Sequence, residues 1–230
     1  MQLGQAGSHM CGGSLGGSNI VISAAHCVLA PDRVVVAYGT NNWADNDNMA
    51  EVKSFIAHPN YSPARIDWDY SYMILQSDVV MSEFVKPIML VPANPNSKYN
   101  NELYGAMATT SGWGYSRHDA SGNPIVIPND LQWVELPLND WETCTGFWGD
   151  SELHPALGRY SARMQCCGGQ GSTSCMGDSG GPLMVKIDEE YRLLGAVSWG
   201  SGTCDEDIAG VYSNIAFPEG RQWYTDEIGL

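Results

Sequence analysis

The six residues Gly177-Asp178-Ser179-Gly180-Gly181-Pro182 (GDSGGP) decide how the rest of the chain is interpreted. From average residue frequencies, this string is expected on the order of once in ten million windows, so chance does not explain it. Small neighbours allow a substrate carbonyl to approach the Ser179 hydroxyl, and glycine lets backbone N–H groups converge on one point. The stretch therefore predicts a serine nucleophile for acyl transfer.

A serine nucleophile needs a neighbouring base, and histidine is the side chain best matched to that role at neutral pH. His26 lies in the run SAAHC (23–27), directly after the apolar residues 20–22. Taken alone, this position fits a structural histidine as well as a base. The other four histidines stand among polar or turn-forming residues, and we expect surface side chains there: His9, His58, His118 and His154.

Composition excludes several classes of partner. The chain of 230 residues carries 26 acidic and 11 basic side chains, a formal net charge of -15 that disfavours binding to nucleic acid. Its apolar runs are too short or too interrupted to span a bilayer, so we expect no membrane segment. Seven cysteines, none in the paired spacing of a zinc site, fit an oxidising compartment.

Short runs rich in β-branched and aromatic residues predict an all-β fold. The predicted strands are 19–23, 33–38, 51–57, 73–75, 132–136, 182–187, 192–199 and 210–215. Two short helices are expected, one over 139–144 with Asn139 as its N-cap and one over 219–228. The polar stretch 94–105 is expected to join two similar β halves.

Six motifs occur in one order along the chain: CGGSL (11–15), SAAHC (23–27), SGWG (111–114), GDSGGP (177–182), SWG (198–200) and GVY (210–212). Together they closely resemble the chymotrypsin-like (trypsin-like) serine proteases from about Met10 to the C-terminus. The resemblance implies two antiparallel six-stranded β-barrels, the first truncated at its N-terminus, and a short C-terminal helix. It also implies one peptidase domain over 1–230, with the first barrel in about 1–100 and the second in about 101–230.

The same resemblance assigns the catalytic roles. His26 becomes the general base, Asp69 the carboxylate that orients it, and the backbone N–H groups of Gly177 and Ser179 the oxyanion hole. Asp67 competes with Asp69, but Asp69 is preferred because an apolar strand follows it closely. The implied activity is endopeptidase hydrolysis through an acyl-enzyme.

The resemblance also pairs the cysteines and leaves Cys167 free. The implied bridges are Cys11 with Cys27, Cys144 with Cys166, and Cys175 with Cys204. In the middle bridge, Cys167 remains an alternative to Cys166, since the loop from 145 to 165 is longer than usual for the family.

The substrate-binding positions implied by the family are Thr173, Ser198, Gly200 and Gly210. Thr173 supplies no charge for a substrate Lys or Arg, and the two glycines leave a deep slot. We therefore expect cleavage after large apolar or aromatic residues, as in chymotrypsins. The acidic run Asp205-Glu206-Asp207 could attract a basic side chain, but we interpret it as a solvated loop.

Active members of the family carry a freed Ile-Val-Gly-Gly N-terminus whose ammonium pairs with the aspartate before the nucleophile, here Asp178. This sequence starts differently, and we expect a zymogen-like chain. Leaving Asp178 buried without a partner would cost on the order of 3 to 5 kcal/mol.

The remaining expectations concern partners and alternatives. The resemblance implies a secreted, extracellular monomer that acts on protein or peptide substrates, meets protein protease inhibitors, and needs no cofactor or metal. Asp45 and Asp47 are interpreted as a polar turn rather than a calcium site. A non-catalytic protease homologue is the alternative function, whereas a lipase-type esterase would require a different order of nucleophile, acid and base.

Overall fold

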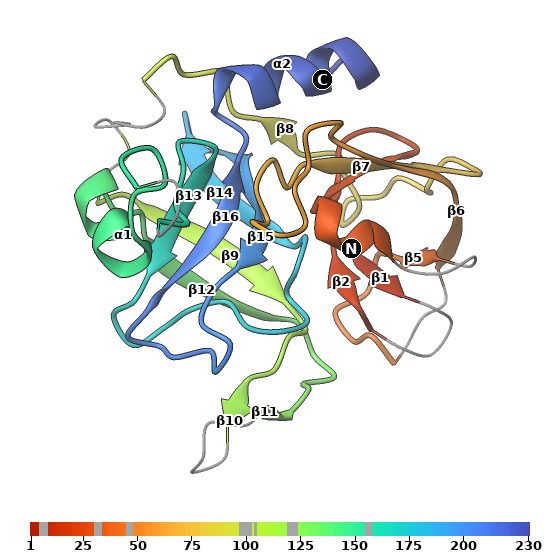
Figure 1. Ribbon diagram of the computed structural model, residues 1–230. Coiled ribbons are helices and arrows are strands. Elements are labelled where there is room, and N and C mark those ends of the chain that lie inside the picture. The colour runs from red at the N-terminus through yellow and green to blue at the C-terminus, as the bar shows by residue number, and fades with distance from the viewer. Residues whose placement is uncertain are drawn as a thin grey trace.

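Two curled β-sheets lie side by side in the computed structural model (Figure 1). The structure describes residues 1–4, 9–29, 34–44, 48–96, 103, 105–118, 124–154 and 158–230. Most strand pairs are antiparallel, and the C-terminal helix lies across the top of the view in Figure 1. Asp45 and Asp47 fall outside the described residues, as does most of the predicted junction near residue 100.

The first sheet is formed by the N-terminal part of the chain. Its order is β2(Cys11–Gly12), β1(Gln2–Gly4), β5(Val35–Ala37), β6(Met49–Ala57), β7(Ser71–Leu75), β4(Ile20–Ser23) and β3(Ser14–Leu15). Val21, Val36 and Met73 are fully buried in its core. A 3-10 segment, η1(Ala25–Leu29), follows β4 and carries His26.

The second sheet contains the longer strands. Its order is β12(Gln132–Pro137), β9(Met107–Gly112), β14(Pro182–Ile187), β15(Glu190–Trp199), β16(Ala209–Asn214) and β13(Met164–Gly168). The short strand β8(Met89–Leu90) adds to β15 in parallel, and a separate hairpin pairs β10(Arg117–His118) with β11(Pro124–Val126). Tyr212, Leu183 and Leu193 are fully buried in the core of this sheet.

The all-β prediction with two sheets and a C-terminal helix is confirmed, and each sheet has seven strands rather than six. All eight predicted runs overlap observed strands. The strands β9 and β13 were not predicted, because their sequences MATTSG and MQCCG together contain only two β-branched residues, both Thr, and no aromatic residue. Strand β8, although it precedes residue 100, pairs with the second sheet.

Two α-helices are present in the described residues. In α1(Trp141–Trp148) the N-cap is Asp140, whose carboxylate accepts the Thr143 N–H at 2.8 Å. The prediction of Asn139 as cap is wrong, because its side chain donates to the Gly168 carbonyl at 2.9 Å instead. Helix α2(Pro218–Ile228) begins with proline and ends at Gly229 in the left-handed conformation. Neither is long and apolar enough to cross a membrane.

Candidate active site

The segment around Ser179 lies between the two sheets and is tied to both. The Gly12 N–H on β2 donates to the Ser179 carbonyl at 2.6 Å, and the Gly180 N–H donates to the Val197 carbonyl on β15 at 2.7 Å. Gly180 has φ +74°, and a Cβ there would collide with the Ser23 hydroxyl just before η1. Glycine is therefore required for the nucleophile segment to approach the segment that carries His26.

His26 and Asp69 form a doubly hydrogen-bonded pair. The backbone N–H of His26 donates to Asp69 Oδ1 at 2.8 Å, and His26 Nδ1 lies 2.8 Å from Asp69 Oδ2. Asp69 is buried at 3% exposure, whereas His26 is partly exposed. This arrangement places a proton on Nδ1 and leaves Nε2 as the basic nitrogen.

Ser198 adds a third hydrogen bond to this carboxylate. Its hydroxyl donates to Asp69 Oδ2 at 2.5 Å from the end of β15, in the second sheet. Ser198 was predicted to bind substrate, and the structure gives it a contact with the acid that sequence alone did not indicate. The acid of the pair is thus held from both sheets.

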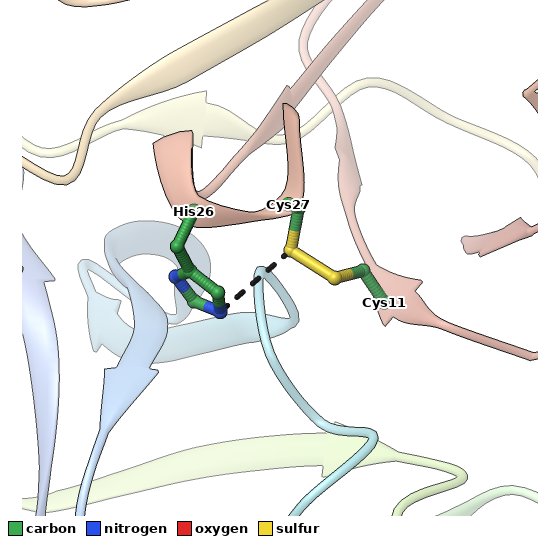
Figure 2. Close-up of side chains that lie close together, drawn as sticks. All are labelled: Cys11, His26 and Cys27. Atoms are coloured by element: carbon green, nitrogen blue, oxygen red, sulfur yellow. Dashed lines mark hydrogen bonds between the residues drawn. A yellow bond between two sulfur atoms is a disulfide. The ribbon is translucent and has the colours of Figure 1, made fainter. Parts of the chain in front are cut away.

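Figure 2 shows His26 Nε2 pointing toward the disulfide between Cys11 and Cys27, 3.9 Å from Cys27 Sγ. With the proton on Nδ1, Nε2 has no proton to donate, and a disulfide sulfur has none either, so Nε2 has no hydrogen-bond donor on this side. The same three residues are close enough to hold a metal ion, but both sulfurs are joined in the disulfide and neither is a thiolate ligand. Among the described residues, the hydroxyl of Ser179 has no hydrogen bond, and the residue is partly exposed.

Asp67, the competing acid, points away from His26 and pairs with a cation. Arg163 Nε lies 2.8 Å from Asp67 Oδ1, and Arg163 Nη2 lies 2.6 Å from Oδ2, a bidentate contact. Burial acts to raise the pKa of Asp67, but the hydrogen bonds and charge of Arg163 outweigh it and lower the pKa. Asp67 is therefore engaged elsewhere, and Asp69 is the acid that reaches the histidine.

Asp178 points away from Ser179 into a pocket of about 150 Å³. Its carboxylate accepts the N–H of Gly114 at 2.8 Å and the N–H of Cys175 at 2.9 Å. In the described part of the chain it forms no ion pair, and burial raises its pKa despite the two hydrogen bonds. An ionised carboxylate in this position would be stabilised by a cation.

His9 was predicted to be a surface side chain, and the structure shows it partly exposed but bonded to the segment before Ser179. Its Nε2 lies 2.7 Å from the carbonyl oxygen of Gly177, its Nδ1 is buried without a partner, and burial lowers its pKa. Because Gly177 is the predicted oxyanion-hole residue, His9 supports that segment from behind. His9 is two residues before Cys11, and this closeness to a disulfide was the only sequence feature that indicated burial. The polar residues before it favoured a surface position instead.

His58 is buried rather than exposed, at 6% exposure. Its ring stacks on Trp68, with ring centroids 4.5 Å apart, and packs edge-on against Trp223 at 4.9 Å. His154 is exposed as predicted, and the side chain of His118 lies outside the described residues. Neither His58 nor His154 contacts His26 or Ser179 in the described structure.

The predicted pocket residues lie together beside the nucleophile segment. A Cβ on Gly210 would be 3.0 Å from Thr173 Oγ1 and 2.9 Å from Ser174 Oγ, and one on Gly200 would be 3.7 Å from Gly210 Cα. Any side chain at Gly210 would therefore enter the space next to Thr173. The acidic run Asp205-Glu206-Asp207 is exposed to solvent.

The described residues form three disulfides, and they are the pairs that the sequence resemblance implied. Cys11 is bonded to Cys27, Cys144 to Cys166, and Cys175 to Cys204. Cys167 is free and fully buried, and burial raises its pKa well above the usual range of a thiol. The bridge from Cys175 joins the nucleophile segment to the loop that precedes Gly210.

Comparison with known proteins gives two findings. The family model described as Trypsin matches residues 1–221. Trypsin alpha-4 from Lucilia cuprina is 34% identical over 220 residues, which cover 94% of this chain and 77% of that relative.

Proposed function

We propose that this chain, which belongs to the trypsin family of chymotrypsin-like serine proteases, is an endopeptidase in which Ser179 attacks the scissile carbonyl. The family match and the trypsin relative support a serine endopeptidase that acts on protein or peptide substrates. The observation that carries the assignment of residues is the double hydrogen bond between His26 and Asp69, next to the segment of Ser179. The whole chain is proposed to act as one peptidase domain.

In the proposed mechanism, His26 Nε2 takes the proton of the Ser179 hydroxyl as its oxygen bonds to the carbonyl carbon. Asp69 holds the imidazole in the required tautomer and stabilises the imidazolium that forms. His26 then donates the proton to the leaving amine, and the acyl-enzyme remains. A water molecule, deprotonated by His26, releases the acyl group and restores Ser179.

The oxyanion is proposed to bind the backbone N–H groups of Gly177 and Ser179. Gly177 has φ +97°, and its carbonyl oxygen lies 2.7 Å from His9 Nε2, a contact that restrains this turn. Preorganised donors of this kind are each worth about 3 to 4 kcal/mol in the transition state.

The primary specificity is proposed to be for large apolar or aromatic residues before the cut bond. Thr173 carries no charge, and Gly200 and Gly210 keep side chains out of the space beside it. Burial of a Phe or Leu side chain there would contribute about 1.5 to 3 kcal/mol. Cleavage after Lys or Arg is the competing preference, with the exposed run at 205–207 as its carboxylate source.

Activity is proposed to depend on a cation that reaches Asp178. The pocket of about 150 Å³ that contains this carboxylate has room for a chain-terminal ammonium and a small side chain. Such a pairing would hold the segment from Gly177 to Ser179 in its catalytic conformation. We further propose that the protein is secreted, works as a monomer and is controlled by protein inhibitors.

The alternative function is a non-catalytic, zymogen-like homologue that binds proteins. The observation that favours it is that the Ser179 hydroxyl donates no hydrogen bond to His26 in the described structure. This contact is often long in proteases without substrate, so it carries less weight than the pair of His26 and Asp69.

The test is a panel of peptides that differ only in the residue before the cut bond: Phe, Tyr, Leu, Ala or Arg. Protein with its native N-terminus is expected to cut after Phe, Tyr and Leu fastest, and Ser179→Ala is expected to cut none. Faster cleavage after Arg or Ala would overturn the specificity. Failure to cut any peptide would favour the binding protein.

A further inference from the structure

Arg159 places a guanidinium directly over an aromatic ring of the site. Its Cζ lies 4.4 Å from the centroid of the Trp199 ring, within the range of a cation–π contact. The backbone N–H of Arg159 donates to the carbonyls of Trp148 and Gly149, so the residue is anchored at the end of α1. The side chain is exposed, and it has no ion pair in the part of the chain that the structure describes.

The ring beneath Arg159 is itself held in place. The Trp148 ring packs edge-on against the Trp199 ring, with centroids 4.8 Å apart, and Trp148 Nε1 donates to the Ala209 carbonyl at 3.1 Å. Trp199 is 8% exposed. A rigid ring limits where the guanidinium can lie, which reduces the entropy that Arg159 would lose on binding an anion.

Trp199 connects this cation to the catalytic residues. It follows Ser198, which donates to Asp69, and it precedes Gly200, a proposed wall of the primary pocket. Gly200 is about 3.8 Å from Trp199 at Cα, and the Trp148 ring that packs on Trp199 is hydrogen-bonded to Ala209, the residue before Gly210, so Arg159 lies near the wall of the pocket. A substrate side chain close to that rim would meet the guanidinium.

The orientation of His26 indicates which part of a substrate lies there. Nε2, the nitrogen that must protonate the leaving amine, faces the Cys11–Cys27 disulfide (Figure 2). Residues after the cut bond therefore lie toward the disulfide, and residues before it lie toward Trp199 and Gly200. An extended peptide advances about 3.3 Å per residue, so positions two to four before the cut bond pass the region of Arg159.

The geometry points to Arg159 as a specificity-determining residue that binds a substrate carboxylate, from Asp or Glu, two to four residues before the cut bond. The planar guanidinium has five N–H donors and matches a carboxylate in a bidentate contact. Its contact with the Trp199 face leaves those donors at the ring's edge free to be used. The inference rests on the proposed peptidase function and adds a second substrate feature to the residue in the primary pocket.

The net charge of -15 allows a local attraction for a substrate carboxylate to be distinguished from the overall effect of the protein's charge. The protein as a whole repels acidic peptides, and this long-range repulsion acts on a carboxylate at any position of the substrate. A preference for acid at some positions and not at others therefore reports a local cation.

The experiment compares Asp with Asn, one position at a time, in peptides with the fastest-cut residue before the scissile bond. We expect the kcat/KM ratio of Asp to Asn to be about 2- to 5-fold higher at one of positions two to four before the cut bond than at two residues after it. This difference is expected to shrink in 0.5 M NaCl, because salt screens an exposed pair. Arg159→Ala should remove the difference, and Arg159→Glu should reverse it.

Lys186→Ala is the matched control. Lys186 is also an exposed cation over an aromatic ring, 5.2 Å from Tyr191, but it lies at the far end of β14, roughly 20 Å along the strand from Ser179. It changes the net charge as Arg159→Ala does and should leave the ratio unchanged. Equal ratios in the unmodified protein and Arg159→Ala would overturn the inference while leaving the peptidase function intact. Absence of any cleavage would instead overturn the peptidase function, and the carboxylate-binding role with it.

Discussion

The bidentate pair of Asp67 and Arg163 is predicted to support catalysis although neither residue touches substrate. Asp67 lies between Ile66 and Trp68, which have φ values of 51° and 56°, and non-glycine residues in this left-handed region cost on the order of 1 kcal/mol or more each. Arg163 holds this strained segment through two hydrogen bonds of 2.8 and 2.6 Å. Asp69 follows Trp68 directly, so the orientation of its carboxylate toward His26 depends on the conformation of residues 66–68.

Arg163→Met removes both hydrogen bonds and leaves a buried carboxylate with only the Trp68 N–H and the Ser161 hydroxyl as partners. We expect the free energy of unfolding in urea to fall by about 3 to 5 kcal/mol at pH 7. Arg163 also lies 5.2 Å above the Trp68 ring, and loss of this contact adds to the effect. In the surviving folded protein, kcat should fall while KM changes little, because Asp69, the proposed catalytic acid, is displaced and the proposed substrate pocket is not.

The double variant Asp67→Leu/Arg163→Met shows whether the loss of stability in Arg163→Met comes from the unpaired buried carboxylate or from lost packing. If the unpaired carboxylate causes the loss, this variant should recover at least half of the stability that Arg163→Met loses. Since Arg163 lowers the pKa of Asp67, the pair's contribution is retained above the ordinary Asp pKa, near 4, and is lost as pH falls below it. The reasoning is refuted if Arg163→Met costs less than about 1 kcal/mol and leaves kcat unchanged.

Three further predictions follow from individual contacts. Ser198→Ala removes the 2.5 Å hydrogen bond to Asp69 and should lower kcat/KM about ten-fold or more, measured with a peptide cut at a large apolar residue. Burial lowers the pKa of both His9 and His58, so their neutral forms stabilise the fold and stability should fall as pH drops below about 6.5, by up to about 1.4 kcal/mol per pH unit for each group. His58→Phe should flatten the decline of Tm between pH 7.5 and 5.5, and an unchanged slope would exclude His58 as a cause. Gly210→Val fills the space beside the primary pocket and should reduce cleavage after Phe far more than cleavage after Ala, with no such selectivity if the pocket lies elsewhere.

The sequence predicted the site residues that lie in short motifs. It missed contacts between residues that are far apart in the sequence and meet only in the fold. Ser179, His26 and Gly180 lie in short runs of small residues, which the close approach of backbone segments requires. The choice of Asp69 over Asp67 agrees with the hydrogen bond between Asp69 and His26, but the sequence could not show that Arg163, nearly a hundred residues later, binds Asp67. His9 was missed for the same reason, because a polar neighbourhood in sequence does not reveal burial against Gly177.

The same limit applies to the strands. Runs with alternating β-branched residues, such as 182–187, were located within one or two residues of their observed bounds. Strand β9 has Thr or Ser at three of its six positions, and it is stabilised by pairing with both β12 and β14 rather than by its own composition. Its Gly112 end lies beside Asp178, so an element that composition could not predict shapes the pocket next to Ser179.

Three buried or partly buried aspartates differ in the partners that the fold provides for their carboxylates. Asp67 has a cation from its own chain, and Asp69 has the histidine and the Ser198 hydroxyl. Asp178 has only two backbone N–H groups, and its raised pKa means that ionisation at neutral pH costs free energy in the folded state. This cost is present above the folded-state pKa and would be relieved by any cation that enters the pocket. Of the three carboxylates, Asp178 is therefore the one through which an added positive charge can both stabilise the protein and set the conformation beside Ser179.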